Sequence, residues 1–320
     1  MGRVDASSVL LGVSEDTFVR FTCTDSRQPI IVCCTSFTIS VRSKKDRLFS
    51  KYGEGVQMDR LGWVEVTPEN FASLIADRVC QIGGGHSYQI IEICSGLGGN
   101  TIQFALRGLR VVGVEVDSGR IHKAKHNCGI YGVEGVEWVE GDFLERQVFD
   151  KVTREVNNSK LIIFISPPWG GPDSNKKPFS FFPPASSLTF DLCMQAVKLP
   201  NVQWLLLYLP KGVCLKEISS LSGILKANKV IVEVLSVEAH PKACVIYFKL
   251  ETHSEGLSHD RTPIDVTNDA YSVEILSVNE LSPKMLRKGF FGNLCRMTTQ
   301  GLLTRFIDPA TLNFHPLFMQ

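Results

Sequence analysis

The 320-residue sequence lacks both an excess of charge of one sign and any long apolar run. Lys and Arg number 34 against 33 Asp and Glu, for a net charge of +1. This balance argues against a protein that coats nucleic acid by bulk charge, so any basic surface must be local. The longest apolar stretches, such as residues 161–165 and 204–209, are far shorter than the roughly 20 residues of a membrane span. With no signal-peptide core near its first residues, the chain is predicted to be a soluble intracellular protein.

The sequence also lacks the cysteine spacing of a metal site or a disulfide framework. Its ten cysteines are scattered with no CxxC pair, which favours reduced and mostly buried thiols. His122 and His126 stand four residues apart on a predicted helix, as metal ligands can, but the residues between them include no glutamate. We therefore expect surface histidines and no metal. The 44% hydrophobic content is enough for a substantial core and argues against long disorder.

The middle of the chain alternates predicted strands and helices. Strands are expected at 88–94, 110–116, 136–140, 161–165 and 204–209, with helices at 100–107, 120–131, 188–197 and 212–228. Two further strands, 230–237 and 243–250, follow one another without a helix between them. The pattern predicts an α/β fold with a doubly wound, mostly parallel sheet that ends in a hairpin.

The two ends of the chain are patterned differently from this middle part. Short strands at 8–13, 18–23 and 30–41 predict a β-rich N-terminal element over residues 1–41. After residue 250 the periodicity weakens, and one helical stretch is expected near 279–288. We divide the chain into 1–41, a segment 42–87 that is expected to contact the ligands, a main domain 88–250 and a C-terminal extension 251–320 whose role is left open.

A glycine-rich turn follows the strand at 88–94 and opens the next helix. Turns of this kind bring backbone N–H groups close to a ligand, and Gly96 and Gly98 supply the tight backbone. The turn does not match a dinucleotide fingerprint, because Thr101 stands where the third glycine would be. A tight turn without a ligand remains the alternative interpretation.

Acidic residues stand at the ends of the next two strands. Glu115 lies 19 residues after Gly96, where a carboxylate can accept both hydroxyls of a ribose. Asp142 and Phe143 end the third strand, an acid and an aromatic ring that suit an adenine. Each acid alone is more often a solvated loop residue. Together with the glycine-rich turn, however, they make three sites at the ends of successive strands, which predict a crevice shaped for a nucleoside.

The segment SPPWGGPD, residues 166–173, comes directly after the most apolar strand. Its two prolines impose a rigid extended backbone and leave carbonyl groups free to accept hydrogen bonds. Ser166 Oγ and the Pro167 carbonyl can then hold an sp² amine with its lone pair toward a sulfonium methyl, while Trp169 stacks on the base. This chemistry predicts methylation of an amino group. A proline-rich turn around a buried tryptophan is the alternative.

These motifs together resemble the trimethylguanosine synthase family, the RNA cap hypermethylases. The resemblance runs from about residue 44 to 250 and rests on RLFSKY at 47–52, LGWVEVTPE at 61–69, GGNTIQFAL at 98–106, GDF at 141–143 and SPPWGGPD. It implies a Rossmann-like class I methyltransferase fold with a mostly parallel seven-stranded sheet, using S-adenosylmethionine as cofactor. It also implies methylation of N2 of a 7-methylguanosine at an RNA 5′ cap. A monomer acting on caps of small nuclear or nucleolar-type RNA in the nucleus is expected, with a cytoplasmic location left open.

The resemblance also implies roles for individual residues. Glu92, Glu115 and Asp142 would hold the amino-acid end, the ribose and the adenine of the cofactor. The other residues implied to form the cofactor site are Thr67, Gly96, Gly98, Asn100, Thr101, Phe143 and Ser166. Ser166, Pro167 and Trp169 would be the catalytic residues that orient the base, with Phe49 facing its second side. A positively charged 7-methylguanine stacked on Trp169 gains a cation–π energy on the order of 1–2 kcal/mol that plain guanine lacks.

A local basic cluster precedes these motifs and suits the triphosphate of a cap. Between residues 41 and 52 one aspartate stands among Arg42, Lys44, Lys45, Arg47 and Lys51. A solvated basic face explains the cluster equally well, and Lys211 is a weaker phosphate candidate. Rival functions are another amino methyltransferase, acting on adenine N6 or a ribosomal-RNA guanine N2, and a cap-binding protein without turnover. A nicotinamide dehydrogenase is disfavoured by the missing third glycine.

Overall fold

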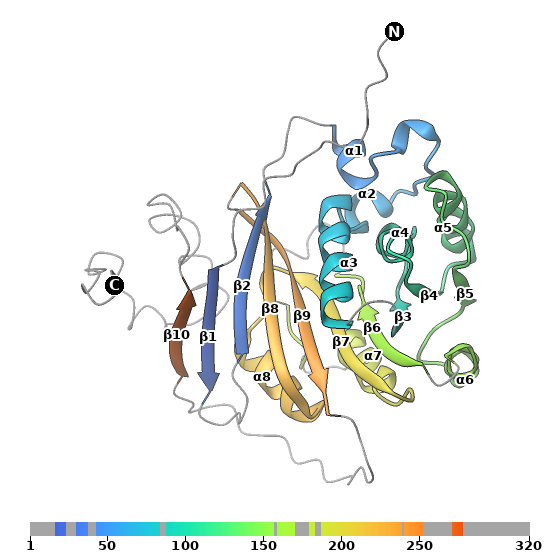
Figure 1. The fold of residues 1–320 in the computed structure, drawn as a ribbon. Helices are drawn as coiled ribbons and strands as arrows, with labels where there is room; N and C mark the ends of the chain where they lie inside the picture. The colour runs from blue at the N-terminus through green and yellow to red at the C-terminus, as the bar shows by residue number, and fades with distance from the viewer. Residues whose placement is uncertain are drawn as a thin grey trace.

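The computed structural model describes residues 17–23, 30–37, 43–83, 88–156, 159–169, 179–182, 187–238, 240–251 and 271–277. Ten strands within these segments form one sheet in the order β10-β1-β2-β8-β9-β7-β6-β3-β4-β5 (Figure 1). The strands are β1 (Thr17–Cys23), β2 (Ile30–Phe37), β3 (Tyr88–Ile93), β4 (Arg110–Glu115), β5 (Glu137–Glu140), β6 (Lys160–Ile165), β7 (Val202–Pro210), β8 (Ala227–Val237), β9 (His240–Leu250) and β10 (Tyr271–Ser277).

The strands β3 to β9 form a contiguous block of seven, and this block is the predicted doubly wound sheet. Four of its six pairings are parallel, and β9 runs antiparallel to both β7 and β8. The expected α/β class and the closing hairpin are therefore confirmed. Residues 161–165 of β6 are all fully buried, because β6 lies between β3 and β7 with helices on both faces. This is the environment that a continuous apolar run predicts.

Helices cover the two faces of the sheet. One face packs against α3 (Glu69–Gly83) and α4 (Gly99–Leu106), which contribute Phe71, Ile75 and Phe104 to a shared apolar cluster. The other face packs against α6 (Arg146–Glu155), α7 (Leu188–Ala196) and α8 (Leu215–Ile224). The helix α5 (Ser118–Ile130) lies beside α4 and joins a smaller cluster under the N-terminal segment.

Three strands extend the sheet beyond the expected seven, so that strand count is corrected to ten. The strand β2 pairs in parallel with β8, β1 pairs with β2, and β10 from the C-terminal extension pairs with β1. An uncovered edge of β8 would expose unpaired backbone groups, which β2 satisfies. A buried carboxylate reinforces the junction, since Glu233 accepts hydrogen bonds from Thr35 of β2 at 2.7 Å, Tyr247 of β9 at 2.8 Å and Arg78 of α3 at 3.2 Å.

Several helices in the described segments are not among the sequence predictions. They are α1 (Lys44–Leu48), the 3₁₀ turn η1 (Tyr52–Glu54), α2 (Gly62–Glu65), α3 and α6. In α6 only Val148 and Val152 are buried, so its apolar stripe is a single i, i+4 pair in a polar sequence. The predicted strand at 8–13 and helix at 279–288 lie outside the described residues, and the domain division stays a prediction. Within the described segments no helix has the length and apolarity of a membrane span.

Candidate active site

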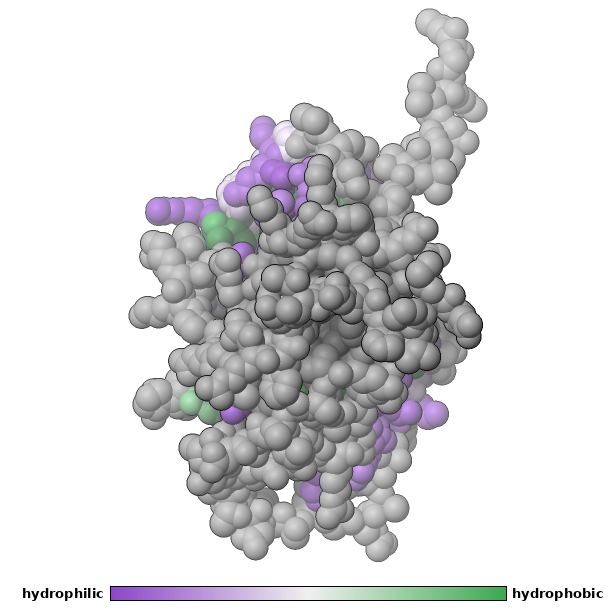
Figure 2. All heavy atoms as spheres, turned by 90° about the vertical axis from the view of Figure 1, so that its left-hand side faces the viewer, coloured by the Kyte–Doolittle hydropathy of each residue, from purple (hydrophilic) through white to green (hydrophobic). Residues whose placement is uncertain are grey.

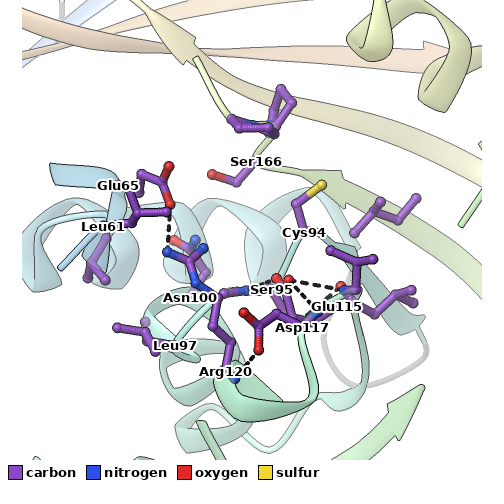
Figure 3. Close-up of a pocket in the computed structure, with 18 of the residues that line it drawn as sticks. Leu61, Glu65, Cys94, Ser95, Leu97, Asn100, Glu115, Asp117, Arg120 and Ser166 are labelled. Atoms are coloured by element: carbon purple, nitrogen blue, oxygen red, sulfur yellow. Dashed lines mark hydrogen bonds and ion pairs between the residues drawn. The ribbon is translucent and has the colours of Figure 1, made fainter. Parts of the chain in front are cut away.

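A cavity of about 480 Å³ opens at the carboxyl ends of β3, β4, β5 and β6 (Figure 3). Its volume lies in the range of roughly 300–1,000 Å³ found for small-molecule sites. Carboxyl ends of parallel strands are where open α/β sheets bind their ligands. Of the predicted site residues, those that line the cavity are Thr67, Gly96, Asn100, Glu115, Asp142, Phe143, Ser166, Pro167 and Trp169.

The turn after β3 forms the floor of this pocket. Gly96 and Gly98 adopt φ values of +57° and +82°, which side chains larger than hydrogen disfavour. Gly98 then caps α4, and a Cβ added there would lie 3.3 Å from the Cβ of Ala124. Cys94 also has a positive φ of +63°, an uncommon backbone state for a residue with a side chain. The local sequence thus holds the backbone of this turn in a conformation that curves under the pocket.

Glu115 is fixed at the pocket edge by three backbone donors. Its carboxylate accepts hydrogen bonds from the N–H of Gly96 at 2.8 Å, of Val116 at 3.0 Å and of Asp117 at 3.1 Å. An ionised carboxylate has about four acceptor positions, so at least one remains for a ligand hydroxyl. The geometry therefore suits the ribose role that the sequence predicts.

Asp142 and Phe143 stand at the end of β5, on the same side of the pocket as Glu115. Asp142 Oδ1 accepts from the N–H of Leu144 at 2.9 Å, and its other oxygen has no hydrogen-bond partner in the described structure. Phe143 is almost fully buried against Phe149, with ring centroids 5.8 Å apart. The preceding Gly141 has φ +133°, and a Cβ there would lie 2.5 Å from Val148 Cγ2. This glycine is required for the chain to present Asp142.

The motif after β6 forms the opposite wall. The N–H of Ser166 donates to the Ile93 carbonyl at 3.2 Å, which ties the motif to β3, while no described protein group bonds the Ser166 hydroxyl. Trp169 Nε1 donates to the Tyr208 carbonyl at 3.1 Å, and the two rings lie 5.1 Å apart. The indole is thus held in place at the pocket wall. Residues 170–173 of the motif lie outside the described residues.

Glu92 lies behind the pocket lining, together with Gly98 and Thr101. Its side chain is fully buried on the α4 side of β3, where one oxygen accepts from the Thr101 hydroxyl and the other has no partner. Burial raises the pKa of Glu92 to about 8, and the Thr101 hydrogen bond opposes this only in part. Asn100 lines the pocket, donates to Thr67 Oγ1 at 3.2 Å and has an equally unpartnered Oδ1.

These orphaned acceptors allow a test of whether the expected cofactor fits. Buried polar atoms are normally hydrogen-bonded, so an unpartnered oxygen on Asn100 in the pocket wall and another on Glu92 behind it indicate a donor that arrives with a ligand. An ammonium group, as at the amino-acid end of S-adenosylmethionine, supplies up to three N–H donors. With Glu115 placed for a ribose, the residues fit this cofactor.

Phe49 does not line the pocket, although its ring lies beside Gly99, which does, so its place against a base stays a prediction. Phe49 is 1% exposed and packs with Tyr131 at 6.3 Å between ring centroids, inside the small cluster under α1. An aromatic residue at the end of α1 completes the local core there, which the sequence pattern cannot distinguish from a base-stacking residue.

The predicted phosphate contacts are exposed and do not line the pocket. Lys44, Lys45 and Arg47 stand on α1, and Lys45 Nζ lies 5.4 Å from the Tyr52 ring centroid. Viewed toward the β10 edge, the described residues at the upper end of the molecule, where α1 lies, are mainly hydrophilic (Figure 2). Lys211 is exposed after β7. The role of these cations stays a prediction.

Sequence reasoning did not identify an ion-paired cluster at the pocket mouth. Arg120 of α5 donates to Asp59 Oδ2 at 2.9 Å and to Glu65 Oε2 of α2 at 2.8 Å. Burial acts to raise the pKa of Asp59, but the hydrogen bonds from Arg120 and the Gly62 N–H, together with the positive charges of Arg120 and Lys123, outweigh it and the pKa is lowered. Arg120 and Glu65 both line the pocket. Nothing in their spacing signals the contact, because 55 residues separate them.

The histidines and cysteines offer no further ligand set in the described segments. His122 and His126 are exposed, and His126 Nε2 lies 3.0 Å from the Gly55 carbonyl. No group of three His, Cys, Asp or Glu side chains arranged to hold a metal occurs among the described residues. The six cysteines whose side chains are described are free thiols.

Comparison with known proteins agrees with this site. The sequence model of a family described as RNA cap guanine-N2 methyltransferase matches residues 87–251. Trimethylguanosine synthase of Schizosaccharomyces pombe is 33% identical over 207 residues, covering 64% of this chain and 82% of that protein. Trimethylguanosine synthase of Saccharomyces cerevisiae is 35% identical over 133 residues, 40% of each chain.

A solved structure of a SAM-dependent methyltransferase from Agrobacterium tumefaciens matches 58% of this chain and 64% of its own, at 15% identity and a TM-score of 0.43. The seven-stranded block has the class I methyltransferase fold that the motifs imply, and S-adenosylmethionine is the cofactor that goes with it. The chain belongs to the RNA cap guanine-N2 methyltransferase family.

Proposed function

We propose that the protein transfers methyl groups from S-adenosylmethionine to the exocyclic N2 of a 7-methylguanosine at an RNA 5′ cap. One observation carries the proposal: the wall opposite Glu115 is made of Ser166, Pro167 and Trp169, a hydroxyl and a carbonyl beside an immobilised indole. Such a wall holds a flat base that carries an amino group. Membership in the cap guanine-N2 family supports this choice of base and atom.

S-adenosylmethionine, when bound, supplies an electrophilic methyl group on a sulfonium centre. Ser166 Oγ and the Pro167 carbonyl accept the two N–H bonds of the base amine, which fixes the direction of its lone pair. Because holding the amine in a near-attack geometry supplies most of the rate acceleration, the site needs no strong base. The amine proton leaves to solvent after the methyl transfer. Glu115 holds the ribose, Asp142 and Phe143 flank the adenine, and Asn100 and Thr67 line the remaining wall with Glu92 behind them.

The same site favours a base that is already positively charged. Trp169 presents its indole to the pocket while Tyr208 holds it from behind, so a 7-methylguanine stacked there gains a cation–π interaction. The exposed cations of α1 suit the triphosphate bridge of a cap. The name shared by the two relatives supports capped RNA as the substrate. We further propose a monomer acting in the nucleus on caps of small nuclear or nucleolar-type RNA.

The experiment that tests this function is mass spectrometry of 7-methyl-GDP and GDP, each incubated with the protein and S-adenosylmethionine. We expect 7-methyl-GDP to gain one or two methyl groups and GDP to gain none, and the mass counts the transfers. Equal methylation of GDP would remove the requirement for N7 methylation and favour another amino methyltransferase. Cofactor binding without methylation of either nucleotide or of capped RNA would leave a protein without turnover.

Replacing Ser166 with alanine is expected to lower kcat about tenfold while KM for 7-methyl-GDP changes little. The hydroxyl acts mainly by orienting the amine for transfer, so its loss affects the transition state more than binding. Steady-state kinetics at saturating S-adenosylmethionine would measure this. Ser118→Ala is the matched control, because Ser118 is exposed at the start of α5 and does not line the pocket. A raised KM with unchanged kcat would assign Ser166 to substrate binding alone.

A further inference from the structure

Glu65 brings a carboxylate into the pocket from outside the sheet. It is the last residue of α2, its side chain is 27% exposed, and it lines the cavity together with Ser166 and Trp169. In Figure 3 the Glu65 carboxylate and the Ser166 hydroxyl point toward one another, away from Glu115. The Glu65 carboxylate thus faces the wall that receives the base rather than the ribose site.

An ion-paired cluster fixes the position of Glu65. Arg120 Nη2 donates to Glu65 Oε2 at 2.8 Å, and the same guanidinium donates to Asp59 at 2.9 and 3.3 Å. Asp59 Oδ1 also accepts the N–H of Gly62, the first residue of α2, at 2.5 Å. The helix and the arginine are therefore clamped together. Two carboxylates share one guanidinium, so the cluster keeps an excess negative charge.

The second oxygen of Glu65 is not used within the described structure. Glu65 Oε1 has no hydrogen-bond partner among the described residues, whereas the other pocket acids bond backbone N–H groups of their own turns. These other acids are Glu115, Asp117 and Asp142. A partly buried, ionised oxygen that faces a cavity is an acceptor available for a ligand donor.

The electrostatic field of the pocket favours cations. Of the described residues that line it, four are carboxylates and one, Arg120, is basic. Burial, followed by Glu115, Asp142, Glu92 and Glu65, raises the pKa of the Cys94 thiol at the pocket floor to about 12. The charge of Glu65 therefore reaches the interior of the pocket, where water screens it less than at the surface.

We propose that Glu65 is a specificity-determining residue for the substrate base. Its free oxygen accepts the guanine N1–H next to the reacting amine, and its charge compensates the positive charge that the N7 methyl group creates. Arg120 is a positioning residue that holds the carboxylate in place. This inference rests on the proposed function and deepens it.

The arrangement separates bases in two ways. Guanine presents N1–H and N2–H donors side by side, whereas adenine presents an acceptor at N1 that a carboxylate would repel. Neutral guanine has the donors but not the positive charge, so it gains only part of the interaction. Glu65 thus discriminates by hydrogen-bond pattern against adenine and by charge against unmethylated guanine.

The test is Glu65→Gln, which keeps the shape of the side chain and removes its charge. Dissociation constants of 7-methyl-GDP, GDP and S-adenosylmethionine are measured by titration calorimetry for the full chain. We expect affinity for 7-methyl-GDP to fall about tenfold, the size typical of a hydrogen bond to a charged group, and affinity for GDP to fall less. The preference for the methylated base then shrinks, while cofactor affinity stays within about twofold.

Two further variants sharpen this test. Glu140→Gln removes the same charge from an exposed residue at the end of β5 that does not line the pocket, so the preference should stay unchanged. Arg120→Lys keeps a positive charge but loses the two-pronged contact with Glu65 and Asp59, so the preference should fall here too. A purely structural role for Arg120 would lower thermal stability without changing the preference.

Three outcomes would overturn the inference. The first is an unchanged preference in Glu65→Gln, and the second is an equal loss of S-adenosylmethionine affinity, which would assign Glu65 to the cofactor. If the glutamine variant does not fold, Glu65→Asp decides, because it keeps the charge but withdraws it from the base; an unchanged preference there is the third. A wild-type protein that binds no 7-methyl-GDP would instead contradict the proposed function itself.

Discussion

Replacing Trp169 with alanine is expected to lower cap methylation severely while affinity for S-adenosylmethionine stays nearly unchanged. Stacking on an aromatic side chain contributes about 1–3 kcal/mol per base, and a desolvated cation over tryptophan adds up to about 2 kcal/mol. Together they predict a loss of about a hundredfold or more in kcat/KM for 7-methyl-GDP. The indole is held by the Tyr208 carbonyl on the wall opposite Glu115, so its removal should leave the ribose site intact.

Two variants separate stacking from folding in this experiment. Trp169→Phe keeps a ring but loses the hydrogen bond to Tyr208 and part of the cation–π energy, so intermediate activity is expected. Trp138→Ala removes the same side chain from β5, where the indole packs outside the pocket lining, and should retain methylation once the folded fraction is accounted for. An equal loss of cofactor affinity in Trp169→Ala would show that the indole contacts the cofactor instead.

The pattern of apolar residues along the sequence was enough to predict the central strands of the sheet and the edge at which the pocket opens. The strands β3, β4, β6 and β7 are apolar runs bounded by turns, and their parallel pairing brings their carboxyl ends to one edge. Residues at or just after the ends of different strands, such as Glu115 and Ser166, therefore meet around one cavity although 51 positions separate them in the chain. The sequence predicts this convergence because topology, not side-chain detail, determines it.

Features that depend on long-range partners could not be predicted in the same way. The N-terminal strands were expected as a separate element, but β2 joins β8, and Thr35 bonds Glu233 across 198 residues. The four-residue helix α2 is too short to show a period, so nothing indicated that Glu65 would reach Arg120. The burial of Phe49 could not be predicted for a related reason, since burial of an aromatic residue depends on its neighbours in space.

Glu92 links the stability of the protein to its cofactor site. Burial raises the pKa of Glu92 from an ordinary value of 4.5 to about 8, because removal from water disfavours the charged carboxylate. An acid whose folded pKa is raised contributes stability that is fully present below pH 4.5 and is lost as pH rises to about 8. Because glutamine stays uncharged at every pH, the Glu92→Gln variant should not lose this stability as pH rises. We expect the ligand-free variant to melt above the wild type at pH 9, with the difference vanishing at pH 4, in thermal unfolding followed by circular dichroism.

The same substitution should have the opposite effect on cofactor binding. If the ammonium of S-adenosylmethionine pairs with ionised Glu92, binding near pH 7 must expel the proton of a carboxyl whose pKa burial has raised above that pH. Calorimetry in two buffers of different ionisation enthalpy should then show release of nearly one proton by the wild type and almost none by Glu92→Gln, together with weaker binding. Absence of proton release from the wild type would place the ammonium on other acceptors, such as Asn100 Oδ1. Glu92 is thus expected to lower stability above neutral pH and yet to strengthen cofactor binding. Both effects have the same cause: folding buries the carboxylate without a positive charge beside it, and the ammonium of the ligand supplies that charge.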